Sequence, residues 1–230
     1  MKIKTEHVSI LVGDNIMPAY VARPEGDEIL PAVIVWMEIF GVNSHIQEVT
    51  ERVAREGYVA CAPNFFHRAA PELNLNYDEA GMNEGIEHMM KLTADNMIAD
   101  QMATIAYLQS RGDVKDGKIG AMGFCIGGHM TYLTACENDL AAAASFYGGG
   151  IAAPEGPGGA QSTISRTANI NCPILCLFGG LDAHIPVEHT SAVDAALKVV
   201  AAVDFRLAAP STSLTHLMLT TNSTVAFSVR

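Results

Sequence analysis

Basic residues are scarce in this sequence. Its 230 residues include 14 lysines and arginines against 25 aspartates and glutamates, so the formal net charge is -11 at pH 7. The few basic residues are spread along the chain and form no cluster that could follow a phosphate backbone. We therefore expect no nucleic-acid partner.

Long apolar runs are also lacking. No stretch approaches the roughly 20 apolar residues that are needed to span a bilayer. The opening residues, MKIKTEHVSI, contain no apolar core of the kind that a signal peptide has. From these two absences we expect no association with a membrane and a cytoplasmic location.

Cysteines are few, and their spacing is irregular. The chain contains five: Cys61, Cys125, Cys136, Cys172 and Cys176. An odd number at irregular spacing indicates reduced thiols and not a disulfide framework. Cys172 and Cys176 lack the paired CxxC spacing of a zinc site, so we interpret them as small buried residues of a strand. The sequence predicts no metal and no cofactor.

Apolar residues, by contrast, are plentiful. They make up 49% of the chain, which is enough for a substantial core, and α/β chains of this length usually form one unit. Two β-rich segments, residues 7–12 and 17–24, flank a turn sequence and predict an opening hairpin. Five short apolar runs then follow, as expected of strands that are covered on both faces: residues 31–37, 58–63, 118–124, 140–148 and 172–179.

Two segments between these runs carry apolar residues at helical spacing. Residues 43–57 begin with the capping residue Asn43 and stop at Gly57. Residues 94–112 repeat the pattern, and the apolar face predicted there consists of Ile98, Met102, Ile105 and Leu108. Alternating strands and helices predict a single α/β domain over residues 1–230, with a mostly parallel, doubly wound sheet.

The segment KIGAMGFCIGGHM places a cysteine at the turn from an apolar run into a helix-like stretch. Gly123 and Gly127 flank Cys125 at two residues on either side, which is the spacing of a nucleophile elbow with sulfur in place of the usual serine oxygen. A Cβ atom at either glycine would collide with neighbouring backbone, and the following helix N-terminus favours a thiolate. The alternative is an ordinary strand-to-helix turn with a buried thiol.

A nucleophile of this kind needs an acid after a later strand and a histidine near the end of the chain. Asp182 fits the acid, because it follows the last of the five apolar runs; the alternative is a turn or helix-capping aspartate. His184 and His189 lie too close to Asp182 to come from the next strand, so we interpret both as loop or helix-surface residues. His216 is the only histidine beyond the last expected strand, which begins at Asp204.

Three segments carry a resemblance to the dienelactone hydrolase family, within the α/β hydrolase superfamily. They are GFCIGG at the cysteine, WMEIFGVNSHIQEVTERVAREGYVACAPNFF, and the acid loop GGLDAHIP. The similarity runs from about Pro31 to Ala209. It implies an α/β-hydrolase fold and hydrolysis of a small ester or lactone, with carboxymethylenebutenolide as the type substrate.

The resemblance also implies roles for individual residues. It makes Cys125 the nucleophile and Asp182 the acid, and it gives Glu38 a carboxylate that contacts the cysteine. Backbone N–H groups of Ile39 and Ile126 would form the oxyanion hole. Glu38 is notable by itself, because a charge at the end of a buried strand points to function.

The end of the chain departs from the family's pattern. The family usually closes with Tyr-Pro, a histidine followed by Gly-Phe or Ala-Phe, and a final helix. Here Pro210 is followed at a longer distance by His216 and then by a Ser/Thr-rich stretch. We therefore expect the C-terminal helix to be missing and residues 205–230 to be an atypical tail. A frameshift near Ala208 and a genuine divergent tail remain as the two explanations.

The leading hypothesis is a hydrolase in which Cys125 forms an acyl-enzyme that water, activated through His216 and Asp182, releases. Arg68 is the candidate to hold a substrate carboxylate, as arginines do in the family, with a solvated surface residue as the alternative. The rival hypothesis is a non-catalytic or thiol-redox protein that keeps the fold with an incomplete triad. We expect a small-molecule ester or lactone as the partner, and a monomer or weak dimer.

Overall fold

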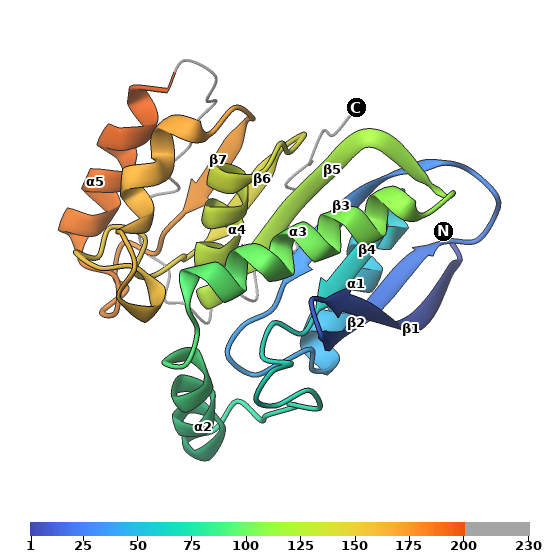
Figure 1. Cartoon of the computed structure of the whole chain (residues 1–230), viewed down its shortest axis with the longest axis horizontal. Helices are drawn as coiled ribbons and strands as arrows, with labels where there is room; N and C mark the ends of the chain where they lie inside the picture. Colours follow the sequence, from blue (N-terminus) through green and yellow to red (C-terminus); the bar gives the residue numbers. More distant parts are fainter. Residues whose placement is uncertain (201–230) are drawn as a thin grey trace.

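A seven-stranded sheet forms the centre of the computed structural model, which describes residues 1–200 (Figure 1). The strands follow the order β1-β2-β4-β3-β5-β6-β7. Their bounds are Ile3–Val12 (β1), Asn15–Pro24 (β2), Leu30–Trp36 (β3), Val59–Pro63 (β4), Val114–Phe124 (β5), Ala143–Phe146 (β6) and Ile174–Leu177 (β7). The strands from β4 to β7 pair in parallel, whereas β1 and β2 form an antiparallel hairpin and β2 joins β4 antiparallel.

The strands predicted within residues 1–200 are confirmed, and their burial explains their composition; the last expected strand, from Asp204, lies outside the described residues. Every residue of β4 and β6 is buried, because helices cover both faces of the parallel part of the sheet. Strand β5 begins earlier than its apolar run, since Val114 already pairs with Leu30 of β3. The mostly parallel sheet with an antiparallel opening is the architecture that the sequence predicts.

Five α-helices accompany the strands in the described part of the chain. Their bounds are Ser44–Arg55 (α1), Glu79–Met89 (α2), Ala94–Ser110 (α3), Ile126–Glu137 (α4) and Val187–Lys198 (α5), with short 3₁₀ turns at Pro157–Gly159 (η1) and Thr163–Asn169 (η2). Asn43 caps α1 as predicted, because its side chain accepts a hydrogen bond from the N–H of Ile46. Helix α2, which projects from the body of the molecule in Figure 1, was not predicted.

The predicted apolar face of α3 is wrong in part. Leu108 is fully buried, but Ile98 and Ile105 are only partly buried and Met102 is 59% exposed. The helix is rotated so that Asp100 points inward, where an ion pair with a loop arginine compensates its burial. Apolar spacing alone could not reveal this, because the compensating cation comes from another part of the chain.

Successive strands are added on opposite sides of β3, so the strand order reverses between β3 and β5. The connection through α1 leads from β3 to β4 on one side, and the connection through α3 then leads to β5 on the other. Because such parallel crossovers are right-handed, α1 and α3 cover opposite faces, as Figure 1 shows. In sheets of this type, ligands bind outside the carboxyl ends of the strands at the reversal point. That place is occupied by the residues that follow β3 and β5.

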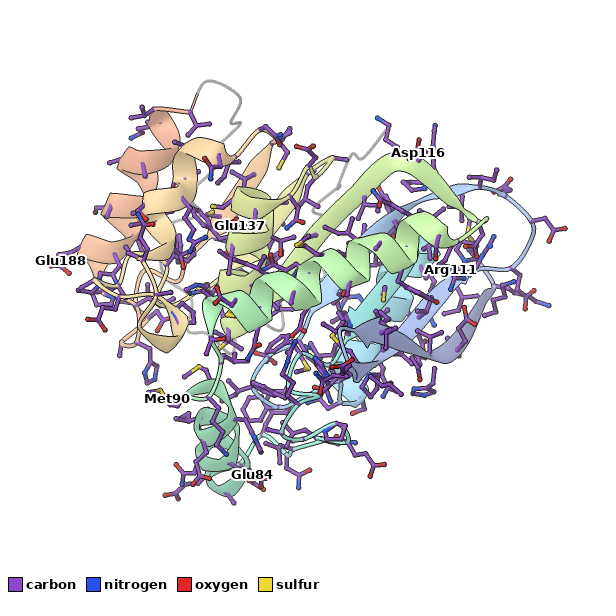
Figure 2. All side chains as sticks on the ribbon, viewed as in Figure 1. Glu84, Met90, Arg111, Asp116, Glu137 and Glu188 are labelled. Carbon is purple, nitrogen blue, oxygen red and sulfur yellow. The ribbon has the colours of Figure 1, made fainter. Side chains whose placement is uncertain are left out.

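Acidic side chains lie on several sides of the molecule. Glu84 on α2, Asp116 on β5, Glu137 on α4 and Glu188 on α5 are labelled in Figure 2 and lie far apart in that view. Within residues 1–200, no helix is long and apolar enough to cross a membrane. In the same residues, no cluster of three His, Cys, Asp or Glu side chains could hold a metal ion.

Candidate active site

Cys125 lies between the end of β5 and the start of α4 in a strained conformation. Its φ of 57° and ψ of -121° fall outside the regions that side-chain-bearing residues favour. Such a conformation costs on the order of 1–3 kcal/mol and persists only where its surroundings hold it. Here the Cys125 N–H donates to the carbonyl of Phe146 at 3.1 Å, and its own carbonyl accepts the N–H of Gly128 at 2.9 Å. This is the backbone conformation expected of a nucleophile elbow.

The flanking glycines allow the elbow to form, as predicted. A Cβ atom at Gly123 would lie 2.2 Å from the carbonyl oxygen of Gly127. A Cβ atom at Gly127 would lie 2.3 Å from the carbonyl oxygen of Trp36 and 2.4 Å from that of Met37. These atoms belong to backbone and cannot move aside, so the elbow packs directly on the segment that leads out of β3.

Glu38 follows β3 on that segment and is only 2% exposed. Because Trp36 pairs with Gly123, the chain leaves β3 and β5 side by side, which brings Glu38 toward Cys125. Two phenols hold its carboxylate. Tyr77 donates its hydroxyl to Oε2 at 2.6 Å, and Tyr147 donates to Oε1 at 3.3 Å.

Opposing effects act on the pKa of Glu38. Burial raises this pKa, because a carboxylate loses its water of hydration in the site. The hydrogen bond from Tyr77, the nearby imidazole of His45 and the hydrogen bond from Tyr147 lower it, in that order of importance. Burial prevails, so the Glu38 carboxylate is a better proton acceptor than an exposed glutamate.

The thiol of Cys125 is held in its protonated form. Burial raises the pKa of Cys125 to about 12, and the carboxylates of Glu38 and Asp182 add to the effect. The backbone N–H of Ile126, at the start of α4, lowers the pKa of Cys125. The helix N-terminus thus favours the thiolate as predicted, but burial and the two carboxylates outweigh it.

Each of the two predicted oxyanion donors directly follows a predicted reactive residue in the chain. Ile126 follows Cys125 directly as the first residue of α4, and its backbone N–H lowers the pKa of the thiol. Ile39 follows Glu38 in a turn, against which α2 packs so closely that a Cβ atom at Gly85 would lie 2.7 Å from the Ile39 carbonyl oxygen. Both isoleucines are buried. Their role as oxyanion donors remains a prediction.

Asp182 lies in the loop between β7 and α5, as predicted. Its Oδ1 accepts the N–H of His184 at 2.8 Å, which is a turn-forming bond. Its charge nevertheless acts on the Cys125 thiol, whose pKa it raises. His184 is exposed in the loop and His189 lies on α5, in agreement with their interpretation as loop and helix-surface residues. His216 and the rest of the atypical tail lie outside the described residues.

Arg68 has an ion-pair partner that the sequence did not reveal. Its Nη1 donates to Asp100 Oδ2 at 3.0 Å and its Nη2 lies 2.9 Å from Oδ1, while the arginine side chain stays 26% exposed. The neighbouring His67 contacts the same carboxylate through Nε2 at 3.0 Å. Arg68 is therefore tied to α3 and is not a freely solvated surface residue.

Two tyrosines of the site were missed by sequence reasoning. Tyr147 directly follows β6 and has a positive φ of 40°, which among the non-glycine residues described is shared only with Cys125. Its place after a buried strand was a usable signal. Tyr77 comes from a loop before α2, and no pattern in the sequence marks it.

The remaining four cysteines differ clearly from Cys125. All five are free thiols, but Cys61, Cys136, Cys172 and Cys176 are buried, whereas Cys125 is partly exposed. Both Cys172 and Cys176 are buried as predicted, but only Cys176 lies on β7; Cys172 lies two residues before the strand begins, so its assignment to a strand is wrong.

Comparisons with known proteins agree with this geometry. The sequence profile of the dienelactone hydrolase family matches residues 17–208. A Synechocystis protein named "Putative carboxymethylenebutenolidase" is 41% identical over 196 residues, covering 85% of this chain and 79% of its own. A protein of the same name from Escherichia coli O157:H7 is 34% identical over 187 residues, covering 81% of this chain and 67% of its own.

Solved structures agree as well. The "Putative Dienelactone Hydrolase" from Klebsiella pneumoniae superposes with a TM-score of 0.79 at 30% sequence identity, covering 91% of this chain and 86% of its own. Nearly the whole described fold is thus shared with that protein. On the match to the family profile, the sequence identities and the shared fold, this chain belongs to the dienelactone hydrolase family.

Proposed function

We propose that this protein hydrolyses small esters or lactones of the carboxymethylenebutenolide type, with Cys125 as the nucleophile. Membership of a hydrolytic family supports the reaction class. The observation that carries the choice of nucleophile is the elbow: a strained cysteine between β5 and α4, on which glycine backbone and the Glu38 segment converge. An ordinary buried thiol would need no such conformation.

The first step requires that the thiol lose its proton as it attacks. With a pKa of about 12, Cys125 is almost wholly protonated at neutral pH. Sγ bonds to the carbonyl carbon while the proton passes to a nearby base, for which the buried Glu38 is suited by its raised pKa. The carbonyl π electrons move to oxygen, and the N–H groups of Ile39 and Ile126 stabilise the resulting oxyanion.

The second step releases the acyl group. Collapse of the intermediate breaks the ester C–O bond, and the departing alkoxide takes up the proton that Glu38 had accepted, which restores the Glu38 carboxylate; in a lactone the alcohol stays attached to the acyl chain. Water, deprotonated by His216 with Asp182 as the orienting carboxylate, then attacks the thioester carbonyl. The C–S bond breaks, and the departing thiolate takes back the proton from His216, which restores the thiol. Arg68 is the proposed contact for a substrate carboxylate, which would share the guanidinium with Asp100.

Hydrolysis of p-nitrophenyl acetate, measured before and after brief treatment with iodoacetamide, tests the proposal. We expect turnover that is lost in step with alkylation of Cys125, which mass spectrometry should find labelled first because the other thiols are buried. Cys125→Ala should abolish turnover, whereas Cys136→Ala should retain it. Preferential labelling of Cys61 or Cys176 would refute the assignment. Rapid labelling of Cys125 without any turnover would favour the non-catalytic or thiol-redox alternative.

A further inference from the structure

Tyr77 comes to Glu38 on a loop that is fastened to the segment after β3. The N–H of Leu75 donates to the carbonyl of Phe40 at 2.9 Å, and Asn74 forms a β-bridge with Gly41. These backbone contacts begin two residues beyond Glu38. The loop and the Glu38 segment therefore form one unit, although 39 residues separate the two hydrogen-bonded side chains in sequence.

The ring of Tyr77 also makes contacts, in addition to the hydrogen bond of its hydroxyl. It packs on Phe40 with ring centroids 4.2 Å apart, and it meets His45 edge to face at 6.1 Å. The side chain nonetheless remains 50% exposed, whereas Glu38 beneath it is buried. Tyr77 thus covers the buried carboxylate from the solvent side.

We propose that Tyr77 is a positioning residue: its phenol holds the Glu38 carboxylate in place as the proton acceptor for Cys125. The inference rests on the proposed function, in which Glu38 accepts that proton. At 2.6 Å the bond from Tyr77 to Oε2 is much shorter than the 3.3 Å bond from Tyr147 to Oε1. A short bond from a hydroxyl to a carboxylate is strong and fixes the geometry of both groups.

The hydrogen bond also lowers the pKa of the carboxylate. Besides Tyr77, three titratable groups act on Glu38 or on the Cys125 thiol beside it, from three different elements: His45 on α1, Tyr147 after β6 and Asp182 after β7. Among the hydrogen bonds and charges that lower the pKa of Glu38, the bond from Tyr77 is the largest. Removing the phenol removes the largest effect that opposes burial, so the pKa of Glu38 should rise further.

Direct titration of the Glu38 carboxyl group tests the inference without relying on turnover. The protein is labelled with ¹³C at glutamate side-chain carboxyls, and the Glu38 resonance is assigned as the one that Glu38→Gln removes. Tyr77→Phe should raise the titration midpoint by about one pH unit, a tenfold change in the ionisation constant. Tyr147→Phe, which removes the longer bond, should raise it less.

A matched control is available on another part of the sheet. Tyr20 donates its hydroxyl to Glu51 at 2.9 Å, so Tyr20→Phe removes a similar bond and should leave the Glu38 midpoint unchanged. Phenylalanine at position 77 keeps the ring contacts, and Tyr77→Leu, which loses them too, should give a midpoint shift in the same direction. Thermal melting of each variant establishes that the proteins are folded.

Turnover then gives a second measurement. The acid limb of kcat/KM for p-nitrophenyl acetate should move upward with the Glu38 midpoint in Tyr77→Phe. An unchanged midpoint in Tyr77→Phe and Tyr77→Leu, or an equal shift in Tyr20→Phe, would overturn the inference. A shifted midpoint without any Cys125-dependent turnover would overturn the proposed function. The conclusion that Tyr77 positions the Glu38 carboxylate would remain valid.

Discussion

Replacing Glu38 by glutamine removes the buried charge with little change of shape. The carboxylate is buried and accepts hydrogen bonds from Tyr77 and Tyr147. Hydrogen bonds to a charged group contribute about 1.5–3 kcal/mol each, and neutral ones about 0.5–1.5 kcal/mol, so Glu38→Gln weakens two bonds by roughly 1 kcal/mol apiece. Burying an amide instead of a carboxylate relieves a desolvation penalty of similar or larger size.

These two changes offset each other, so the free energy of unfolding should change by no more than about 1–2 kcal/mol. For a chain of this length, each kcal/mol shifts the melting temperature by about 2–4 °C. We therefore expect Glu38→Gln to melt within about 8 °C of the wild-type protein. Calorimetry or melting followed by circular dichroism measures this directly.

Turnover should respond very differently. Loss of a positioned general base lowers rates by about 10²–10⁴-fold, and kcat/KM for p-nitrophenyl acetate should fall by that amount. The pKa of Cys125, by contrast, should fall below about 12, because the Glu38 charge contributes to raising it. Alkylation of Cys125 by iodoacetamide should then be faster than in the wild-type protein, although hydrolysis is slower.

A control substitution tests whether the effects are specific to Glu38 or follow from neutralising any carboxylate that is bonded to a tyrosine. Glu51 on α1 accepts the hydroxyl of Tyr20, so Glu51→Gln makes the same chemical change away from the site and should leave both rates unaltered. Unaltered turnover in Glu38→Gln would refute the role of Glu38 as a base. A loss of stability much larger than about 3 kcal/mol would show that the residue is structural.

Two further predictions concern the backbone and the ion pairs. Gly127→Ala should destabilise the protein by at least about 1–3 kcal/mol and lower esterase activity, because the added Cβ would lie 2.3 Å from the Trp36 carbonyl oxygen. Gly112→Ala is the control, because a Cβ there would meet nothing within 4 Å. Equal melting temperatures of the two variants would contradict the steric argument. Hydrogen bonds from Arg111 lower the pKa of Asp113 to about 2, against about 3.9 in an unfolded chain, so their stabilisation is present above pH 4 and lost as the pH falls toward 2. Asp113→Asn should flatten that part of the stability curve measured by urea unfolding, and a curve parallel to wild type between pH 2 and 4 would contradict the assignment.

Local patterns in the sequence were sufficient for the framework of the site. A strand, a tight turn and a helix are neighbours in the chain, so the spacing of Gly123, Cys125 and Gly127 determines the elbow wherever the fold places it. Strand ends are equally local, which is why Glu38 could be recognised as a charge after a buried run. Asp182 was accessible by the same reasoning, because it follows the last apolar run within a few residues.

Tertiary structure decided what surrounds these groups. Tyr77 and Tyr147 reach Glu38 from 39 and 109 residues away, and only the packing of the loop before α2 and of the end of β6 brings them there. The inward face of α3 was mispredicted for the same reason, since Asp100 is compensated by a cation from another segment. The pKa of Cys125 follows this pattern too: the helix N-terminus that favours a thiolate is visible in the sequence, whereas the burial that outweighs it is a property of the assembled fold. Desolvation depends on every atom around a group, and a one-dimensional sequence does not specify that surrounding directly.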